Sequence, residues 1–217
     1  MKYPHSRFLM LFSVAAMSFG FLSGCASSSA SLGKGARAAD GLVDSANLIR
    51  EGMSRIDSTL GSMRALRTMT GGELPGLYSK YTKDLDSLES VAGRVASTNK
   101  KMMSEGKRYF DKWEEQIASM NNEEIRNRST KRQAEVRKAL DDVAKGYTKV
   151  SDEYSGLISD LRDIRISLKT DLTTDGVRSL SGPMERAEKS GQRVIDAAEK
   201  VAASYEALGM KMSAGGG

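Results

Sequence analysis

The feature that most constrains the fold is an apolar spacing that alternates between four and three residues. The rhythm is unbroken at Val136, Leu140, Val143, Tyr147, Val150, Tyr154, Leu157, Leu161, Ile164 and Leu168. Residues three and four apart share one face of an α-helix, so this spacing predicts a long helix with a coiled-coil-like apolar seam.

The same spacing recurs in three other stretches, which are separated by residues that end or start helices. The stretches are Leu42–Met63, Tyr81–Met120 and Met184–Leu208, and the breaks are Gly71-Gly72, Asn121-Asn122 and residues 173–176. No stretch shows the period-two alternation of a strand. We therefore predict an all-α fold with helices at about 40–70, 75–120, 123–172 and 183–209.

Four helices on short connections predict an elongated antiparallel four-helix bundle over residues 40–210, with 211–217 as a flexible tail. The two central helices are longer than the outer two, which leaves residues 106–138 without partners. At 1.5 Å per residue, this central hairpin would project roughly 20–25 Å beyond the bundle, at the end where the first helix begins. The alternative is a hairpin that folds back.

The first residues have the form of a secretory leader. Lys2 and Arg7 precede an apolar run, Phe8–Leu22, that is too short for a comfortable membrane span. Small residues then lead to Cys25, the single cysteine of the chain. The pattern predicts a signal peptide over 1–24.

Leu22-Ser23-Gly24-Cys25 resembles the lipobox of bacterial lipoproteins. The resemblance implies cleavage before Cys25, acylation of its thiol and an anchor in a membrane. Because Ala26 is not the aspartate of inner-membrane retention, it also implies the periplasmic face of the outer membrane in a Gram-negative cell. Residues 25–39 are then a flexible tether. The alternative is an ordinary signal peptide with an incidental cysteine.

Removal of the leader narrows the available chemistry. His5, the only histidine, is lost, and without His or a free Cys the usual zinc sites and Ser-His-Asp or Cys-His nucleophiles are excluded. The loss of Lys2 and Arg7 from 33 basic residues leaves 31 against 28 acidic ones, a net charge of +3. We therefore predict no catalytic residue, metal site, cofactor or nucleic-acid partner.

The predicted hairpin concentrates aromatic and basic residues. They are Tyr109, Phe110, Trp113, Arg126, Arg128, Lys131 and Arg132. Such side chains suit an anionic phospholipid surface or an acidic protein, so they form the candidate interaction surface. The alternative is that the aromatic residues pack the two helices together.

Two acidic pairs have simpler explanations than a site. Asp171 and Asp175, beside several threonines, suit a cation, acid–base chemistry or, more commonly, the capping of a helix end. Asp84 and Asp86 lack the glycine and later ligands of a calcium loop.

A second resemblance rests on three groups of residues. They are Tyr109-Phe110-x-x-Trp113-Glu114, Ile125-Arg126-x-x-Ser129-x-x-Arg132 and Leu168-x-x-Asp171-Leu172-Thr173-x-x-Gly176-Val177. Over roughly residues 36–210 the chain resembles an uncharacterised family of secreted, all-helical bacterial proteins. That family implies no activity.

These observations favour a non-enzymatic envelope lipoprotein with a structural, scaffolding or adaptor role. Its partners would be the membrane, through the lipid anchor, and another envelope protein or phospholipid. The first alternative is a carrier or holdase for an apolar ligand or peptide between loosely packed Met- and Ala-rich helices. An enzyme that uses carboxylates is a more distant alternative, and apolar heptads also leave self-association open.

Overall fold

The computed structural model describes residues 26–69 and 72–214, and every regular element in these ranges is an α-helix. The helices are α1 (Ala26–Thr68), α2 (Leu74–Ala118), α3 (Glu123–Thr170), α4 (Thr174–Ser179) and α5 (Ser181–Ala214). The all-α prediction is confirmed. Four helices match the predicted ones, and the short α4 is an element that the apolar spacing does not predict.

The helix ends follow from local chemistry. Pro75 lies in the first turn of α2, where its missing N–H costs no hydrogen bond. At the start of α3, Asn122 Oδ1 accepts a hydrogen bond of 3.1 Å from the amide of Ile125. Glu123 and Glu124 then place negative charge in the first turn, where the helix dipole favours it.

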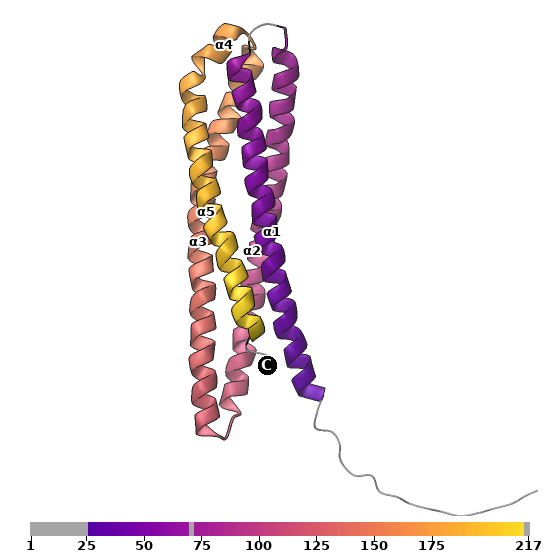
Figure 1. Cartoon of the computed structure of the whole chain (residues 1–217), viewed down its shortest axis with the longest axis vertical. Helices are drawn as coiled ribbons and strands as arrows, with labels where there is room; N and C mark the ends of the chain where they lie inside the picture. The colour runs from indigo at the N-terminus through magenta and orange to yellow at the C-terminus, as the bar shows by residue number, and fades with distance from the viewer. Residues whose placement is uncertain (1–25, 70–71, 215–217) are drawn as a thin grey trace, which may run out of the picture.

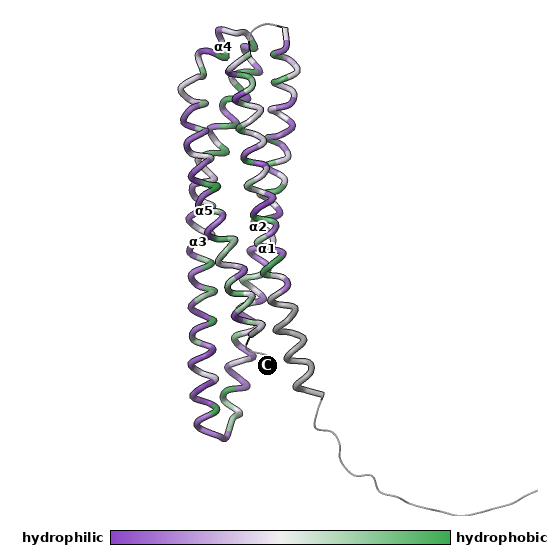
Figure 2. Tube along the Cα trace, viewed as in Figure 1, coloured by the Kyte–Doolittle hydropathy of each residue, from purple (hydrophilic) through white to green (hydrophobic). Residues whose placement is uncertain are grey.

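The four long helices lie side by side in an elongated rod (Figure 1), and consecutive long helices run in opposite directions. α1 packs against α2 and α5, and α3 packs against α5 and α2, with α2–α3 the least extensive of these four contacts. The start of α1 and the α2–α3 connection lie at one end of the rod, and α4 lies at the other (Figure 1). Hydrophobic residues recur along the helices at intervals between hydrophilic ones (Figure 2).

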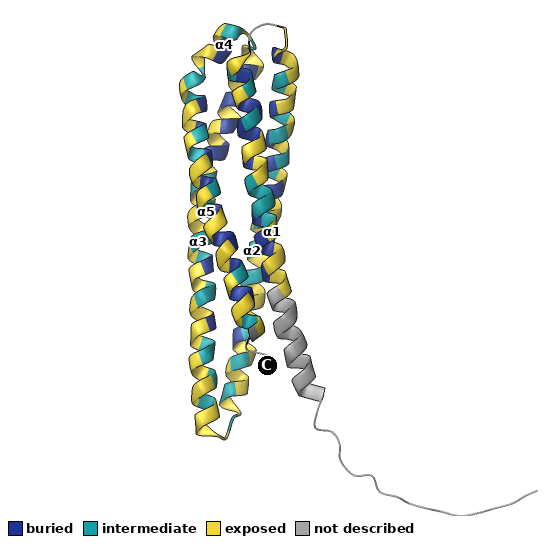
Figure 3. Ribbon diagram, viewed as in Figure 1, coloured by how far each residue is buried: buried dark blue, intermediate teal, exposed yellow. Residues whose placement is uncertain are grey.

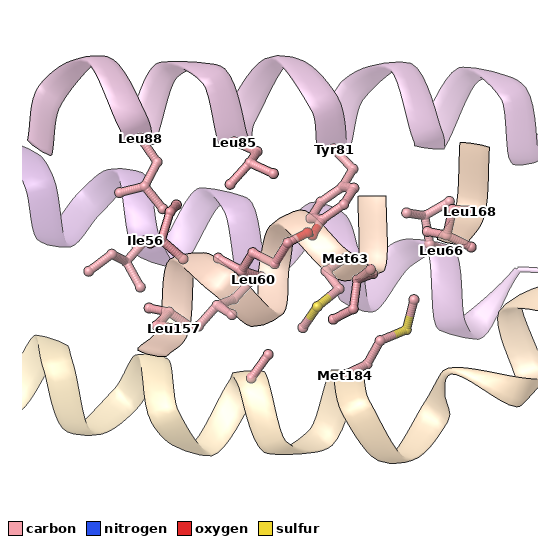
Figure 4. Packing of buried hydrophobic residues seen from close by; sticks show 14 of the residues in the cluster. Ile56, Leu60, Met63, Leu66, Tyr81, Leu85, Leu88, Leu157, Leu168 and Met184 are labelled. Atoms are coloured by element: carbon pink, nitrogen blue, oxygen red, sulfur yellow. The ribbon is translucent and has the colours of Figure 1, made fainter. Parts of the chain in front are cut away.

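The core consists of two clusters of buried side chains along the rod (Figure 3). The cluster toward α4, here the distal cluster, includes Leu60, Tyr81 and Leu161 (Figure 4 shows its packing). The cluster toward the hairpin, here the proximal cluster, includes Leu42 and Tyr205. The Tyr81 hydroxyl donates to the Leu161 carbonyl at 2.7 Å, so its burial leaves no unmet hydrogen bond.

One glycine permits the close contact of α5 with α1. A Cβ added to Gly191 would lie 2.5 Å from Leu60 Cδ1 and 3.4 Å from Ile56 Cγ2. Gly191 is buried, so the two helices approach each other here more closely than a side chain allows.

Two boundaries differ from the sequence prediction. α1 is helical from Ala26, although residues 25–39 are predicted to be a tether. Five of residues 26–39 are alanines, the best helix formers, and a helix extends readily from the packed part of α1. α5 likewise runs to Ala214 rather than to about 209. The predicted signal peptide 1–24, the lipidation site Cys25 and the tail residues 215–217 lie outside the described residues.

Candidate functional site

The predicted aromatic cluster lies in the hairpin of α2 and α3. The Tyr109 ring meets the Phe110 and Trp113 rings edge to face, with both centroid distances 5.6 Å. Phe110 and Trp113 stack almost in parallel at 6.3 Å, and Phe110 is only 5% exposed. Edge-to-face and offset pairs each contribute about 0.5–1.5 kcal/mol beyond the area that they bury. The three rings therefore form a compact unit.

Side chains of α3 hold this aromatic unit in place. Trp113 Nε1 donates to Ser129 Oγ at 3.0 Å, and Gln133 Nε2 donates to the Phe110 carbonyl at 3.3 Å. The Arg137 guanidinium lies 4.9 Å from the centre of the Phe110 ring. The aromatic residues thus join the two arms of the hairpin, which favours the packing interpretation for Tyr109, Phe110 and Trp113.

Two of the four predicted basic residues also make internal contacts. Arg126 Nη1 donates to the Met120 carbonyl at 3.3 Å and so braces the connection between α2 and α3. Arg132 donates to the Lys211 carbonyl in the last turn of α5. A guanidinium at the C-terminal end of a helix satisfies an orphan carbonyl and interacts favourably with the helix dipole.

The other two, Arg128 and Lys131, are exposed. Arg128 pairs with Glu124 one turn earlier at 2.6 Å, an exposed pair of the kind that contributes little to stability. Together with Lys138 they form an outward stripe of α3, here the α3 stripe. Of the predicted interaction surface, only this part faces solvent fully. Glu124 and Glu135 lie on the same face, so the stripe is only weakly basic.

The predicted absence of partners over 106–138 is wrong for part of that range. Phe110 and Val136 belong to the proximal cluster with Leu208 of α5, and Met212 packs against it. The reason is the greater length of α5, which reaches the hairpin. Only the end of the hairpin extends past the end of α5, as Figure 1 shows, and it continues straight rather than folding back.

The turn after α3 is held by capping interactions. Thr173 Oγ1 accepts a hydrogen bond from the Gly176 amide at 3.1 Å and donates one to Asp171 Oδ1 at 2.7 Å. Asp175 pairs with Arg178 at 2.7 Å. A Cβ on Gly176 would lie 2.8 Å from Asp171 Oδ2, so a side chain does not fit there. These contacts support the capping interpretation of Asp171 and Asp175.

Two further properties concern the described residues as a group. No three His, Cys, Asp or Glu side chains among them lie close enough together to hold a metal ion. Within the same ranges, each helix is too polar or too short to cross a membrane.

A site that the sequence analysis did not locate lies inside the rod. A cavity of about 320 Å³ lies between the distal and proximal clusters and is lined by members of both. All four long helices line it, for example through Met53 of α1, Ala92 of α2, Tyr154 of α3 and Ala198 of α5. Glu89 is the one carboxylate in its lining, so carboxylates do not converge there as they would in an acid–base site.

The cavity opens between α2 and α3. Its exposed lining residues, Gly93, Ala96, Ser151 and Arg162, all belong to these two helices. At the opening, Arg162 Nε donates to Glu89 Oε1 at 2.8 Å. The Tyr154 hydroxyl is buried and has no hydrogen-bond partner in the described part of the chain. Burial is the main reason that its pKa is raised to about 12, and the Glu89 charge adds to the effect.

The chain matches a known protein family. Residues 34–210 match DUF2959, a protein family of unknown function. The chain belongs to the DUF2959 family. The resemblance to an uncharacterised family over roughly residues 36–210 is thereby confirmed. Neither the curated proteins nor the solved structures contain a match to this DUF2959 protein.

Within this DUF2959 protein, several of the residues on which the resemblance rests join elements. Trp113 and Ser129 connect the hairpin arms, Arg132 connects α3 to α5, and Thr173 and Gly176 shape the turn into α4. These residues therefore maintain the arrangement of the helices. The sequence analysis misses the cavity, and the signal that could have located it is the set of small residues facing the seam, Gly52 and Ala92.

Proposed function

We propose that this DUF2959 protein is an envelope lipoprotein, acylated at Cys25 after removal of residues 1–24, that acts without catalysis as a scaffold or adaptor. In this proposal the four long helices form an antiparallel bundle with coiled-coil-like packing. Its location is the periplasmic face of the outer membrane of a Gram-negative cell. Its partners are the anchoring membrane and a second envelope protein.

The observation that carries the proposal is the position of the hairpin relative to the start of α1. Both lie at the same end of the rod, and the hairpin extends past the end of α5 (Figure 1). Because α1 is helical from Ala26, an acylated residue 25 would bring this end of the rod to the membrane. The hairpin would then face the lipid headgroups.

The length of the rod supports a role in spacing. α3 has 48 residues, which corresponds to about 72 Å at 1.5 Å per residue. The α4 end would therefore stand far from the membrane, where it can meet a partner. Hydrogen bonds of Trp113, Ser129 and Gln133 join the two arms of the hairpin. The hairpin end is therefore suited to hold the rod in a fixed position rather than to bend.

The outer surface supports contacts with polar partners. Ion pairs connect neighbouring helices on it, including Arg50 with Glu206 at 2.5 Å and Arg165 with Asp86 at 2.8 Å. Most of α3 in the hairpin is coloured hydrophilic in Figure 2, and the α3 stripe adds a small positive excess, while Ile125 near the connection is 54% exposed. Such a surface suits headgroups or an acidic protein better than the hydrocarbon interior of a membrane.

In-cell photo-crosslinking tests the proposal. A photoreactive residue at Lys131 in the α3 stripe is compared with one at Lys189, an exposed lysine of α5 away from the hairpin. We expect lipid or membrane-protein adducts from Lys131 and a different set from Lys189. Mass spectrometry of the same material should show acylated Cys25. An unmodified thiol, or no adduct from either position, would contradict the proposal.

A further inference from the structure

We propose that the cavity between the distal and proximal clusters binds a single acyl chain whose uncharged, ester- or amide-linked head lies at the opening between α2 and α3. This activity goes beyond a scaffold role, because it uses the interior of the rod rather than its surface. The proposal names a ligand for the carrier function, the alternative that the Met- and Ala-rich helices suggest.

The size of the cavity favours a slender ligand. A volume of about 320 Å³ lies at the lower end of the range of ligand pockets, which runs from about 300 to 1,000 Å³. Along the rod the lining extends from Ile49 to Ile56 on α1 and from Tyr147 to Arg162 on α3. At 1.5 Å per residue these spans are about 10 and 22 Å. The lining is therefore longer along α3 than along α1, a shape that suits an extended chain.

The chemistry of the walls favours a hydrocarbon. The inner wall, from α1 and α5, is formed by Ile49, Met53, Ile56, Val194, Ala198 and Val201. The side chains of the inner wall carry no charge and no hydrogen-bonding group other than the weak thioether acceptor of Met53. Each CH₂ of a ligand buried against such a wall raises the affinity about four-fold. The polar groups of the site lie instead at the opening between α2 and α3.

The polar side chains of the lining favour an amphiphile. Glu89, Ser151 and Arg162 belong to the lining, and Ser151 and Arg162 are exposed at the opening. A ligand whose hydrocarbon lies against the inner wall leaves its polar head beside these groups. A pure hydrocarbon would cover them without offering a hydrogen bond.

The charges at the opening select an uncharged head. Arg162 is paired with Glu89 at 2.8 Å, and Arg165 lies between Asp86 at 2.8 Å and Glu89 at 4.0 Å. The charges of these two guanidinium groups and two carboxylates therefore cancel. A carboxylate head would add an unbalanced negative charge next to Glu89, so an ester or amide carbonyl fits better.

The wall formed by α2 explains how a chain enters. Ala92, Gly93 and Ala96 give this side little side-chain volume, and a Cβ placed on Gly93 meets no atom within 4 Å. α2 and α3 also make the least extensive of the four neighbouring helix contacts. Entry between them would displace the Glu89–Arg162 pair, which is half exposed on the Arg162 side.

Isothermal titration calorimetry of the full chain tests the proposal, with monolauroylglycerol as the probe below its micelle-forming concentration and lauric acid as the charged comparison. We expect saturable one-to-one binding of monolauroylglycerol and at least ten-fold weaker binding of lauric acid at neutral pH. Equal or tighter binding of lauric acid would contradict the assignment of an uncharged head. No saturable binding of either probe would overturn the proposal.

One pair of variants locates the binding. Ala92→Trp fills the cavity and should abolish binding, whereas Ala203→Trp, at an exposed position of α5, should leave it unchanged. Unchanged affinity in Ala92→Trp would place the ligand elsewhere and overturn the proposal.

Discussion

Trp113 of α2 and Ser129 of α3 are joined by a hydrogen bond of 3.0 Å from the indole Nε1 to the hydroxyl oxygen. The bond connects the two arms of the hairpin at the edge of the proximal cluster, against which Trp113 packs. Trp113 is the only tryptophan in the chain, so its fluorescence reports on this region alone.

Ser129→Ala should loosen the hairpin locally. It leaves the partly buried indole N–H without its acceptor, at a cost of about 1–3 kcal/mol. We expect faster amide exchange over residues 113–132 and a red shift of the Trp113 emission, with the distal cluster unaffected. Ser155→Ala, at an exposed position of the same helix, is the matched control. Unchanged exchange in the hairpin of Ser129→Ala would show that the bond does not hold the arms.

Arg132→Gln should release the end of α5 from the hairpin. The substitution removes the guanidinium that bonds the Lys211 carbonyl, together with its favourable interaction with the helix dipole, worth about 0.3–1 kcal/mol. Amide exchange over residues 205–214 should accelerate. Arg128→Gln, which breaks only an exposed pair, should not change exchange there. Equal exchange in the two variants would contradict this role for Arg132.

Gly191→Ala should destabilise the protein although alanine is the better helix former. The gain in helix propensity is about 1 kcal/mol. The new Cβ would lie 2.5 Å from Cδ1 of the buried Leu60, and overpacking of this kind costs about 1–3 kcal/mol. Gly156→Ala, where a Cβ meets nothing within 4 Å, should instead be stabilising by about 0.5–1 kcal/mol. Urea denaturation measures both values, and a stabilised Gly191→Ala would refute the close contact of α5 with α1.

Two tyrosine-to-phenylalanine variants should change stability in opposite directions. Tyr154→Phe removes a buried hydroxyl that has no partner in the described residues, so the unliganded protein should gain about 1 kcal/mol. Tyr81→Phe removes the donor to the Leu161 carbonyl and should cost a similar amount. Urea denaturation of both variants in detergent-free buffer checks the signs. A loss of stability in Tyr154→Phe would indicate that the hydroxyl is satisfied in solution.

The stability of the protein should fall at high pH, in part through Tyr154. Its folded-state pKa is raised to about 12, chiefly by burial, while an unfolded tyrosine titrates near pH 10. Between these values the unfolded chain has released a proton that the folded chain keeps, so the free energy of unfolding decreases as pH rises. The decrease from about pH 9 to about pH 11 should be smaller in Tyr154→Phe. Identical decreases would contradict the burial of this hydroxyl.

The helices and most of their ends can be predicted from the sequence because the determinants are local. The four-three spacing of Val136 to Leu168 requires only that neighbouring turns share a face, and Asn122 and Pro75 act within one turn. The end of α5 is harder to predict. The apolar spacing stops at Leu208, yet helix-compatible residues and the contact of Arg132 with Lys211 carry the helix on to Ala214.

The site is less predictable because it depends on contacts between distant segments. Arg126, Arg128, Lys131 and Arg132 are equivalent as basic residues in the sequence, but two of them bind backbone carbonyls and two face solvent. The cavity has the same origin. In the sequence, Gly52 and Ala92 are ordinary small residues. They line a cavity only because the four helices around them stay too far apart to fill the space that larger side chains would occupy.

The central claim is that the rod is anchored with its hairpin end at the membrane, and energy transfer to acceptor lipids tests it most directly. The mature protein, acylated at Cys25, is reconstituted in vesicles and labelled through an engineered cysteine at Asn121, in the hairpin connection, or at Arg178, in α4. Because α3 alone spans about 72 Å, transfer should be efficient from position 121 and weak from position 178. Equal transfer from both positions, or stronger transfer from position 178, would contradict the account.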